Sequence, residues 1–435
     1  MTVFTFKLYF KDYKMKILIV NTSDNSGGAA RAAYRLHKSL LAKGVESKML
    51  VQTKCSDDHT IEVYSKSFFQ KLIAKVKPIV DFFLLRPYIN RDKMLFSPSL
   101  FGFNDVVKEI NASNPDVVHL HWINGGMIRI EDLSKIKAPI VWTLHDNWPF
   151  TGGCHIMWEC EKYKKNCGSC PRLGSHKEHD LSRKIFNRKQ TTFAKLPNMV
   201  IVGLSKWLES CAKESSLFRN HKIVNLPNPI DTNVFKPFDK RQARGLWDLP
   251  QNKKLILFGA MSATSDVNKG FKELTESLFL LNDLNIEFVI FGSSEPKEKQ
   301  PFKVKTHYLG HLSDDVSLIT LYSAVDIMVV PSMQEAFGQT ASESMACGTP
   351  VVAFSHTGLL DIVEHKKTGY LAKPFERQDL AAGIEWVLNN PNYNELSENG
   401  RNKIVREFDS SVVANKYIEL YKEISVIQSV ELEKK

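Results

Sequence analysis

The chain has 435 residues, of which 43% are hydrophobic and 24% are charged, and its formal net charge is +10. This length exceeds what one ordinary core accommodates, so two domains are expected, and the composition excludes a disordered chain. A basic chain can bind nucleic acid or anionic lipid, but no nucleic-acid-binding module is recognisable, so no nucleic-acid partner is expected.

The N-terminal leader carries no recognisable targeting signal. Residues 1–14 lack the apolar core and cleavage site of a signal peptide. We expect translation to begin at Met15, or, if it begins at Met1, the leader to be a loose tail. No run in the chain approaches the roughly 18 consecutive apolar residues that a membrane span needs. The protein is therefore expected to be cytoplasmic.

A glycine loop follows the first predicted strand. The apolar run 15–20 is followed by Gly27-Gly28 and then by a helical pattern that ends near Lys43. Strand, glycine loop and helix are the opening of a βα unit. Further along, the segment 66–86 mixes basic and apolar residues. We expect it either to make peripheral contact with an anionic membrane, at the inner face of the plasma membrane, or to pack as a helix on the N-terminal domain.

Three more apolar runs predict buried strands, at 115–122, 139–145 and 199–203. Ser205 is placed to cap the helix that follows the last of them. His119 and His121 alternate with apolar residues, so one is expected to face the core and the other a cleft. Alternating strands and helices favour a parallel sheet that is covered on both faces.

Four of the seven cysteines lie within seventeen residues, at Cys154, Cys160, Cys167 and Cys170. The last two have the spacing of a zinc knuckle, and four thiolates suit a closed tetrahedral site with a structural Zn²⁺ ion. His155 is an alternative ligand. Free or loosely paired thiols, disulfides and another metal are the other possibilities, although a cytoplasmic chain disfavours disulfides.

A second series of strands follows the segment 225–237, which is rich in proline and turn formers and is predicted to be a linker. The strands of this series are predicted at 254–259, 287–292, 306–310, 326–330 and 349–354. The pattern favours an α/β protein with two Rossmann-like domains facing a cleft, an N-terminal domain at 15–235 and a C-terminal domain at 236–411. The cysteines mark an insertion at 150–175 in the first.

Two carboxylates lie close to the end of the strand predicted at 326–330. Glu335 is expected on the loop after it, and Glu343 in the helix that begins near Gln339. Doubly wound sheets bind ligands at this edge, and a helix N-terminus offers free N–H groups to a phosphate. Carboxylates accept hydrogen bonds from sugar hydroxyls. The pattern indicates a ligand with phosphate and sugar; the alternative is an ordinary amphipathic helix with solvated glutamates.

The run from Glu335-Ala-Phe-Gly-Gln to Val-Val-Ala-Phe354 resembles the signature of the family 4 (group 1) glycosyltransferases. These are retaining enzymes of the GT-B fold that use nucleotide-sugar donors. The resemblance implies that Glu335 binds donor-sugar hydroxyls, that Glu343 binds the ribose, and that 412–435 forms a helix returning to the first domain. Other donor-binding residues implied by it are Phe337, Gly338, Gln339, Gly259, Ser262, Gly310, Gly27 and Gly28.

The diphosphate site implied by this resemblance is incomplete. The family usually has an Arg after the first glycine of the stretch 259–270 and a Lys before the last one. Lys269 matches, but Ala260 stands where the Arg is expected. Lys269, with Ser262 and backbone amides as helpers, is thus expected to hold the diphosphate; a solvated lysine is the alternative. The leaving diphosphate is implied to help deprotonate the acceptor, and no catalytic metal is expected.

His145 stands where the family often has a histidine near the reacting centre, so it is expected to be catalytic together with Glu335 and Lys269. A structural histidine is the alternative. The stretch 142–155 resembles a subgroup associated with bacterial surface polysaccharide (colanic-acid-like) synthesis. Its aromatic residues Trp148 and Phe150 are expected either to stack on an acceptor sugar or to pack in the core.

The resemblance implies a retaining glycosyltransferase that moves a sugar from a nucleoside-diphosphate sugar to a saccharide or lipid-linked acceptor, in bacterial surface polysaccharide synthesis. UDP or GDP donors are favoured. Two alternatives stay open: a nucleotide-sugar epimerase of the same fold, and an inactive relative acting as a partner subunit, which Ala260 keeps possible.

Overall fold

The computed structural model describes residues 14–64, 76–77, 79–100, 105–281, 285–295 and 304–433. The leader at 1–13 and half of the basic segment 66–86 lie outside this part of the chain. Two compact units divide the chain. The first consists of Met1–Gly203, Glu209–Leu226 and Ala414–Lys435, and the second of Leu204–Leu208 and Pro227–Val413. The chain passes between them at Leu226, inside the proline-rich segment 225–237.

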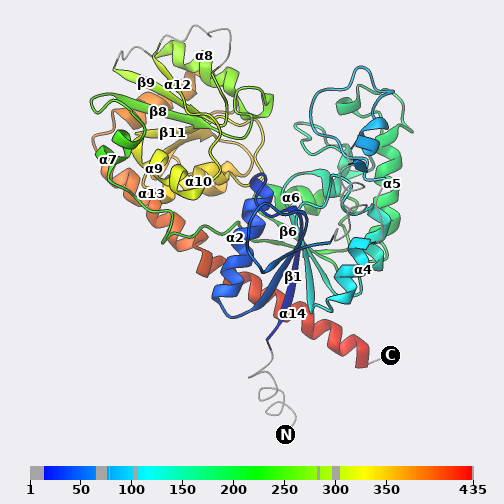
Figure 1. The fold of residues 1–435 in the computed structure, drawn as a ribbon. Coiled ribbons are helices and arrows are strands. Elements are labelled where there is room, and N and C mark those ends of the chain that lie inside the picture. The colour runs from blue at the N-terminus through cyan, green and yellow to red at the C-terminus, as the bar shows by residue number, and fades with distance from the viewer. Residues whose placement is uncertain are drawn as a thin grey trace. The chain divides into compact units, whose positions relative to one another are not determined.

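The first unit is built on a seven-stranded sheet with the order β3-β2-β1-β4-β5-β6-β7, in which all pairs are parallel. Helices α2 and α4 lie to either side of it (Figure 1). The strands are β1 (Lys16–Ser23), β2 (Glu46–Thr53), β3 (Ile61–Val63), β4 (Val117–Leu120), β5 (Ile140–Leu144), β6 (Val200–Gly203) and β7 (Lys222–Asn225). The helices are α2 (Gly28–Ala42), α4 (Asp105–Ala112), α5 (Leu181–Phe193) and α6 (Lys206–Glu214), with short 3-10 turns between them.

The central strands are buried on both sides, which explains their continuous apolar sequences. Every residue of β4, β5 and β6 is buried. Parallel strands covered by helices on both faces have no solvent side and so do not alternate with polar residues. Ser205 caps α6 as predicted, because its hydroxyl accepts the N–H of Leu208 at 3.2 Å.

The second unit has a six-stranded parallel sheet with the order β10-β9-β8-β11-β12-β13. Its strands are β8 (Lys254–Gly259), β9 (Ile286–Phe291), β10 (Thr306–Tyr308), β11 (Ile327–Val330), β12 (Val351–Phe354) and β13 (Gly369–Ala372). Its helices are α7 (Lys240–Leu246), α8 (Phe271–Leu280), α9 (Asp315–Ala324), α10 (Gln339–Ala346), α11 (Leu359–Ile362), α12 (Arg377–Leu388) and α13 (Tyr393–Phe408). One core cluster joins both layers, from Phe258 and Phe288 on the sheet to Leu274 and Ile384 on the helices.

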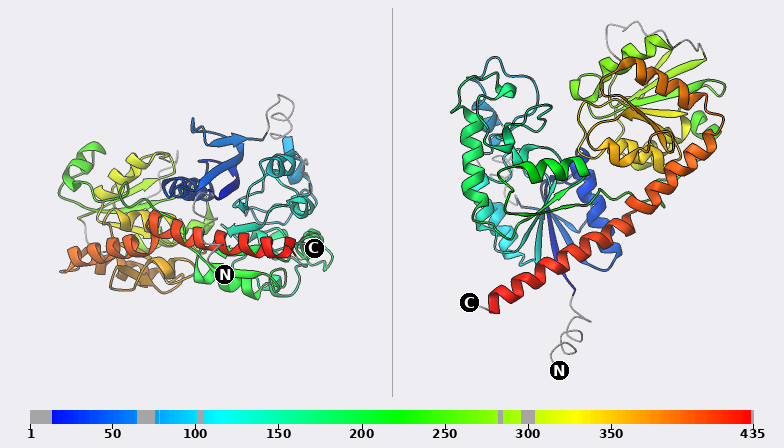
Figure 2. Two further views of the ribbon diagram at one scale, coloured as in Figure 1. Left: turned by 90° about the horizontal axis from the view of Figure 1, so that it is seen from below. Right: turned by 180° about the vertical axis from the view of Figure 1, so that it is seen from behind.

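The last helix, α14 (Ser410–Glu433), starts in the second unit and belongs to the first unit from Ala414 onward. In the first unit it packs against the sheet (Figure 2). The Tyr421 hydroxyl on this helix lies 2.7 Å from Nδ1 of His119. No helix in the described part of the chain is long and apolar enough to cross a membrane.

Candidate active site

Glu335 lies on the loop between β11 and α10, at the carboxyl end of the second sheet. Neighbouring residues hold the backbone of this loop in place. The N–H of Glu335 donates to the Thr357 hydroxyl at 3.0 Å, and the N–H of Gly358 donates to the Glu335 carbonyl at 2.9 Å. The Ser332 hydroxyl donates to the carboxylate at 3.0 Å. Two loops therefore fix the direction of the Glu335 side chain.

Lys269 and Glu335 form an ion pair. The Lys269 Nζ atom lies 2.6 Å from Oε1 of Glu335, and the two side chains are 23% and 19% exposed. Burial alone lowers the pKa of Lys269, but the charge and hydrogen bond of Glu335 more than offset this, and the pKa is raised. Lys269 thus carries its positive charge at neutral pH. The residues expected to bind diphosphate and sugar lie side by side.

Asn268 connects the loop that carries Lys269 to the loop that carries Glu335. Its side-chain amide donates to the Gln334 carbonyl at 2.8 Å, and its own carbonyl accepts the N–H of Met333 at 2.8 Å. The next position, Gly270, has φ +69°, and a Cβ atom there would lie 1.9 Å from the Pro331 carbonyl oxygen. Only glycine lets the chain turn into α8 at this distance from β11. The loop geometry therefore sets Lys269 against Glu335.

Glu343 lies in α10, on the helix predicted for it, and is 3% exposed. Its Oε2 accepts a hydrogen bond from the Tyr322 hydroxyl at 2.9 Å, and its Oε1 accepts one from the Gln339 amide at 3.3 Å. A buried carboxylate needs such donors, because its charge is costly to remove from water. Glu343 is thus held in a fixed orientation rather than solvated on an amphipathic helix, and that alternative is wrong for it.

The other predicted donor residues of the second unit differ in setting. Phe337 is 3% exposed and packs edge-on against Phe408, with ring centroids 5.6 Å apart. Gly338 is the N-cap of α10. Gly259 ends β8, and Ser262 is exposed on the turn after it. The Gly310 carbonyl, past β10, accepts the N–H of Gly292 at 2.7 Å. These positions lie at or beyond strand ends, where ligands bind in such sheets.

His145 lies directly after β5, at the carboxyl end of the first sheet. Its Nε2 atom is 2.8 Å from Nδ1 of His121, which follows β4. Burial lowers the pKa of His145 to about 4 and moves the pKa of His121 well below its ordinary value. Both imidazoles are therefore neutral at physiological pH.

One expectation about these histidines is wrong. His119 and His121 are 0% and 3% exposed, and their ring centroids are 4.3 Å apart. Residues two apart on a strand lie on the same face, so alternation with apolar residues does not separate them. His119 is bonded through Nδ1 to the Tyr421 hydroxyl and through Nε2 to the Thr143 hydroxyl, both at 2.7 Å.

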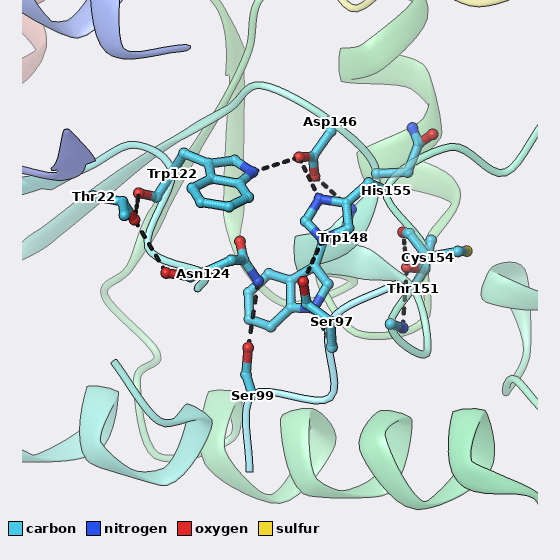
Figure 3. A network of polar contacts seen from close by, with 12 residues as sticks. Thr22, Ser97, Ser99, Trp122, Asn124, Asp146, Trp148, Thr151, Cys154 and His155 are labelled. Atoms are coloured by element: carbon cyan, nitrogen blue, oxygen red, sulfur yellow. Dashed lines mark hydrogen bonds and ion pairs between the residues drawn. The ribbon is translucent and has the colours of Figure 1, made fainter. Parts of the chain in front are cut away.

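Asp146 organises the loop beside His145 (Figure 3). Its carboxylate accepts the Trp122 indole N–H at 2.9 Å and the Trp148 backbone N–H at 2.8 Å, and lies 2.6 Å from Nδ1 of His155. The pKa of Asp146, which burial raises, is lowered overall by His155 and these N–H donors. The second ring nitrogen of His155 is 2.7 Å from the Ser97 hydroxyl. His155 is therefore engaged in this network.

Of the two alternatives for Trp148 and Phe150, packing in the core is the one that the structure shows, and stacking on an acceptor sugar is wrong. The two side chains are 1% and 0% exposed. The Trp148 indole donates to the Ser97 carbonyl at 2.7 Å, and Phe150 packs edge-on against Tyr163. Both belong to the core around the cysteine segment.

Gly27 and Gly28 stand at the start of α2, after the β1 strand, as predicted. Asp24 ties their loop to the next one, because its carboxylate accepts the N–H groups of Cys55 and Ser56, both at 2.9 Å. The Asn21 side chain accepts the N–H of Trp122 at 2.8 Å. The glycine loop is thus anchored to the loops after β2 and β4.

The four clustered cysteines line one small cavity of about 10 Å³. All seven cysteines are free, so disulfides are not formed. Within the described residues, no group of three or more His, Cys, Asp or Glu side chains is arranged to hold a metal ion as it stands. Burial raises the pKa of Cys167 to about 12 and that of Cys170 to about 11.

Sequence reasoning missed Asn268, Thr357 and Tyr322, and it assigned His121 no role. Asn268 precedes the Lys-Gly pair, so its place before a predicted phosphate residue was the available signal. The other three carried none, because their partners are between 21 and 24 positions away in the sequence.

Two units, each with a parallel sheet and with polar residues at the carboxyl ends of its strands, are the arrangement of the GT-B fold. Residues 239–403 match the family Glycosyl transferases group 1, and residues 26–234 match Glycosyltransferase Family 4. The chain therefore belongs to the group 1, family 4 glycosyltransferases, and it is a transferase enzyme of saccharide synthesis.

Known proteins resemble it over most of its length. WcaC of Escherichia coli K12, named as a colanic acid biosynthesis glycosyl transferase, is 26% identical over 357 residues, 78% of this chain and 83% of WcaC. Sucrose-phosphate synthase from Thermosynechococcus elongatus superposes with a TM-score of 0.68 at 18% identity, over 95% of this chain and 100% of that one. Anabaena HepE, solved with UDP-glucose, superposes with a TM-score of 0.64 at 16% identity, over 94% and 100% of the two chains.

Proposed function

We propose that the protein is a retaining glycosyltransferase whose second unit binds a nucleoside-diphosphate sugar. The pairing of Lys269 with Glu335 at 2.6 Å carries this proposal, because it sets a phosphate-binding cation beside a carboxylate that can accept sugar hydroxyls. The N-terminus of α10 supplies further N–H groups to an anion. Glu343, oriented by Tyr322, binds the ribose in this scheme.

The proposed reaction requires no side chain of the protein to act as a general base. Lys269 stabilises the negative charge that develops on the leaving diphosphate, and this diphosphate takes the proton of the acceptor hydroxyl. Glu335 orients the sugar being transferred. His145, in the first unit, contacts a sugar oxygen. The acceptor in this proposal is a saccharide or a lipid-linked saccharide of a bacterial surface polysaccharide, supported by the similarity to WcaC.

A donor screen tests the proposal directly. A bound donor raises the melting temperature by mass action, so UDP-, GDP- and ADP-sugars are compared by thermal shift. UDP-sugars are expected to stabilise most, since the similar HepE structure holds UDP-glucose. The configuration of the new glycosidic bond, measured by NMR, must match that of the donor sugar; inversion would contradict the retaining mechanism.

Two alternatives have distinct outcomes in the same assays. An epimerase converts one nucleotide sugar into another with no acceptor present, whereas a transferase needs an acceptor. An inactive partner subunit turns over no donor, and its residual signal does not change with Glu335→Gln. Loss of acceptor-dependent turnover in that variant excludes both.

We propose that the described end of the segment 66–86 lies on an anionic membrane at the cytoplasmic face. Phe82 and Phe83 are 52% and 46% exposed, and the Arg86 guanidinium lies 3.8 Å from the Phe83 ring centroid. Exposed aromatic and basic side chains together suit a membrane interface. The protein is expected to co-sediment with phosphatidylglycerol vesicles and not with phosphatidylcholine vesicles. Phe83→Ser should reduce this binding, whereas the control Val316→Ser should not. A parent protein that does not bind the anionic vesicles would contradict the proposal.

We also propose a structural zinc ion among Cys154, Cys160, Cys167 and Cys170. The Cys167 sulfur accepts the Gly152 N–H at 3.1 Å, which suits a thiolate. Because the side chains are not arranged as a metal site as they stand, the sulfurs must shift toward the ion. Four thiolates would close the coordination sphere and leave no position for catalysis.

Lys189 supports this charge arrangement. It is fully buried, donates to the carbonyls of Trp148 and Thr151, and lies 3.7 Å from the Trp148 ring centroid. A buried ammonium group is costly without nearby negative charge, which the thiolates would supply. Elemental analysis should find about one zinc per chain, lost in Cys170→Ser and kept in Cys55→Ser, whose cysteine is exposed. A parent protein without stoichiometric zinc contradicts the proposal.

A further inference from the structure

His121 and His145 share one hydrogen bond at the carboxyl ends of the adjacent strands β4 and β5. Nδ1 of His121 and Nε2 of His145 are 2.8 Å apart. The other nitrogen of His121, Nε2, is buried and has no hydrogen-bond partner among the described residues. His145 is partly exposed, so its Nδ1 atom is the nitrogen of the pair that can meet a ligand.

Two arrangements of protons satisfy the shared bond, since a neutral imidazole has one N–H donor and one acceptor nitrogen. In the first, His121 donates from Nδ1, its buried Nε2 is a lone pair, and His145 carries its proton on Nδ1. In the second, His145 donates from Nε2, His121 carries a buried N–H on Nε2, and the His145 Nδ1 atom is a lone pair. The two arrangements offer a ligand opposite groups, a donor or an acceptor.

The burial of His121 decides between them. Its side chain is 3% exposed, so an Nε2 proton would be an N–H group removed from water without an acceptor. Orphaned buried N–H groups are rarer in proteins than buried acceptors with an unused lone pair. A doubly protonated ring is disfavoured as well, because burial lowers the pKa of His145 to about 4. The first arrangement is therefore the more stable one.

We propose that His121 is a positioning residue that holds His145 in the Nδ1–H form, so that His145 is a neutral hydrogen-bond donor to an oxygen of the bound sugar. The hydrogen bond from His145 to the sugar rests on the function proposed above, whereas the positioning of His145 by His121 does not. His121 thus determines which group His145 offers to a ligand, although only His145 meets the sugar.

His119 provides a matched comparison on the same strand. It is as buried as His121, but both of its nitrogens are already bonded, to the hydroxyls of Tyr421 and Thr143. In the described part of the chain, His119 makes no hydrogen bond to His145, so its replacement should affect packing and not the proton on His145. Any effect of replacing His121 that is also seen when His119 is replaced is therefore structural.

The position of the proton can be measured without an activity assay. In ¹⁵N-histidine-labelled protein, the two ring nitrogens of a neutral histidine have well-separated chemical shifts, and His145→Gln assigns the signals. We expect His145 to be protonated on Nδ1 in the parent protein and to become a mixture of forms in His121→Phe. In His119→Gln the Nδ1–H form should persist. Protonation on Nε2 in the parent protein would overturn the proposal.

Activity then tests the consequence. His121→Phe should lower kcat about tenfold, the value of about one hydrogen bond, with KM within about twofold. His121→Asn keeps an N–H donor near Nδ1 and should restore most of kcat, while His119→Gln should leave kcat unchanged. Unchanged kcat in His121→Phe, with the His145 proton displaced, would refute the catalytic consequence. Full activity in His145→Gln would instead refute the proposed role of His145 and leave the positioning intact.

Discussion

Separating Lys269 from Glu335 tests the proposed division of labour between diphosphate and sugar. In Lys269→Met the cation is lost, so binding of free UDP should weaken. In Glu335→Gln the cation is released from its partner at 2.6 Å, so UDP should bind equally well or more tightly. Transfer from the UDP-sugar should nevertheless fall in both variants. The two substitutions are thus expected to differ in nucleotide affinity, since Lys269→Met weakens UDP binding and Glu335→Gln does not.

The size of the effect follows from the geometry. Both side chains are about one-fifth exposed, so the pair is only partly screened by water. Hydrogen bonds to charged groups contribute about 1.5–3 kcal/mol. We therefore expect UDP affinity to fall by about tenfold to a hundredfold in Lys269→Met. The coupling energy between the two positions, measured for UDP binding with the double variant, should lie in the same range.

Isothermal titration with UDP measures binding, and acceptor-dependent UDP release measures transfer. Melting temperatures of the variants show whether the fold is kept. A Lys269→Met variant that binds UDP within twofold of the parent protein would refute the assignment of Lys269 to the diphosphate. Equal loss of UDP affinity in both variants would show that the pair acts as a structural unit only.

Two further predictions concern stability. Gly270→Ala should destabilise the protein by more than the roughly 1–2 kcal/mol of a left-handed residue, because its Cβ would meet the Pro331 carbonyl at 1.9 Å. Gly310 has φ +68° and no heavy atom within 4 Å of an added Cβ, so Gly310→Ala should lower the free energy of unfolding by only roughly 1–2 kcal/mol, measured by chemical denaturation. Equal losses of stability in the two variants would contradict the steric argument. Burial lowers the pKa of His37 from 6.5 to about 4, so the unfolded chain takes up this proton first. The free energy of unfolding should therefore fall by about 3 kcal/mol as the pH drops from about 6.5 to 4. This loss should be smaller in His37→Gln and of full size in the control His59→Gln. Parallel pH curves for the parent protein and both variants would contradict the prediction.

Much of the fold could be predicted because parallel strands covered on both faces need continuous apolar sequences. The runs ending before His145 and before Glu335 are such strands, and the positions of these residues at strand ends follow from them. The proline-rich segment 225–237 contains the point where the chain leaves the first unit. The strand β13 was not predicted, because its sequence Gly-Tyr-Leu-Ala has no β-branched residue and is buried only at its two ends.

What the sequence determined by itself is the placing of polar residues after apolar strands, because local pattern sets where a strand stops. Only the tertiary structure decided which of them touch. It pairs Lys269 with Glu335 across 66 positions, places the Tyr322 hydroxyl against Glu343, and buries Trp148, one of the two aromatic candidates for stacking on a sugar. Such contacts depend on the order of strands in the sheet and on the course of the loops, and neither leaves a periodic trace in the chain.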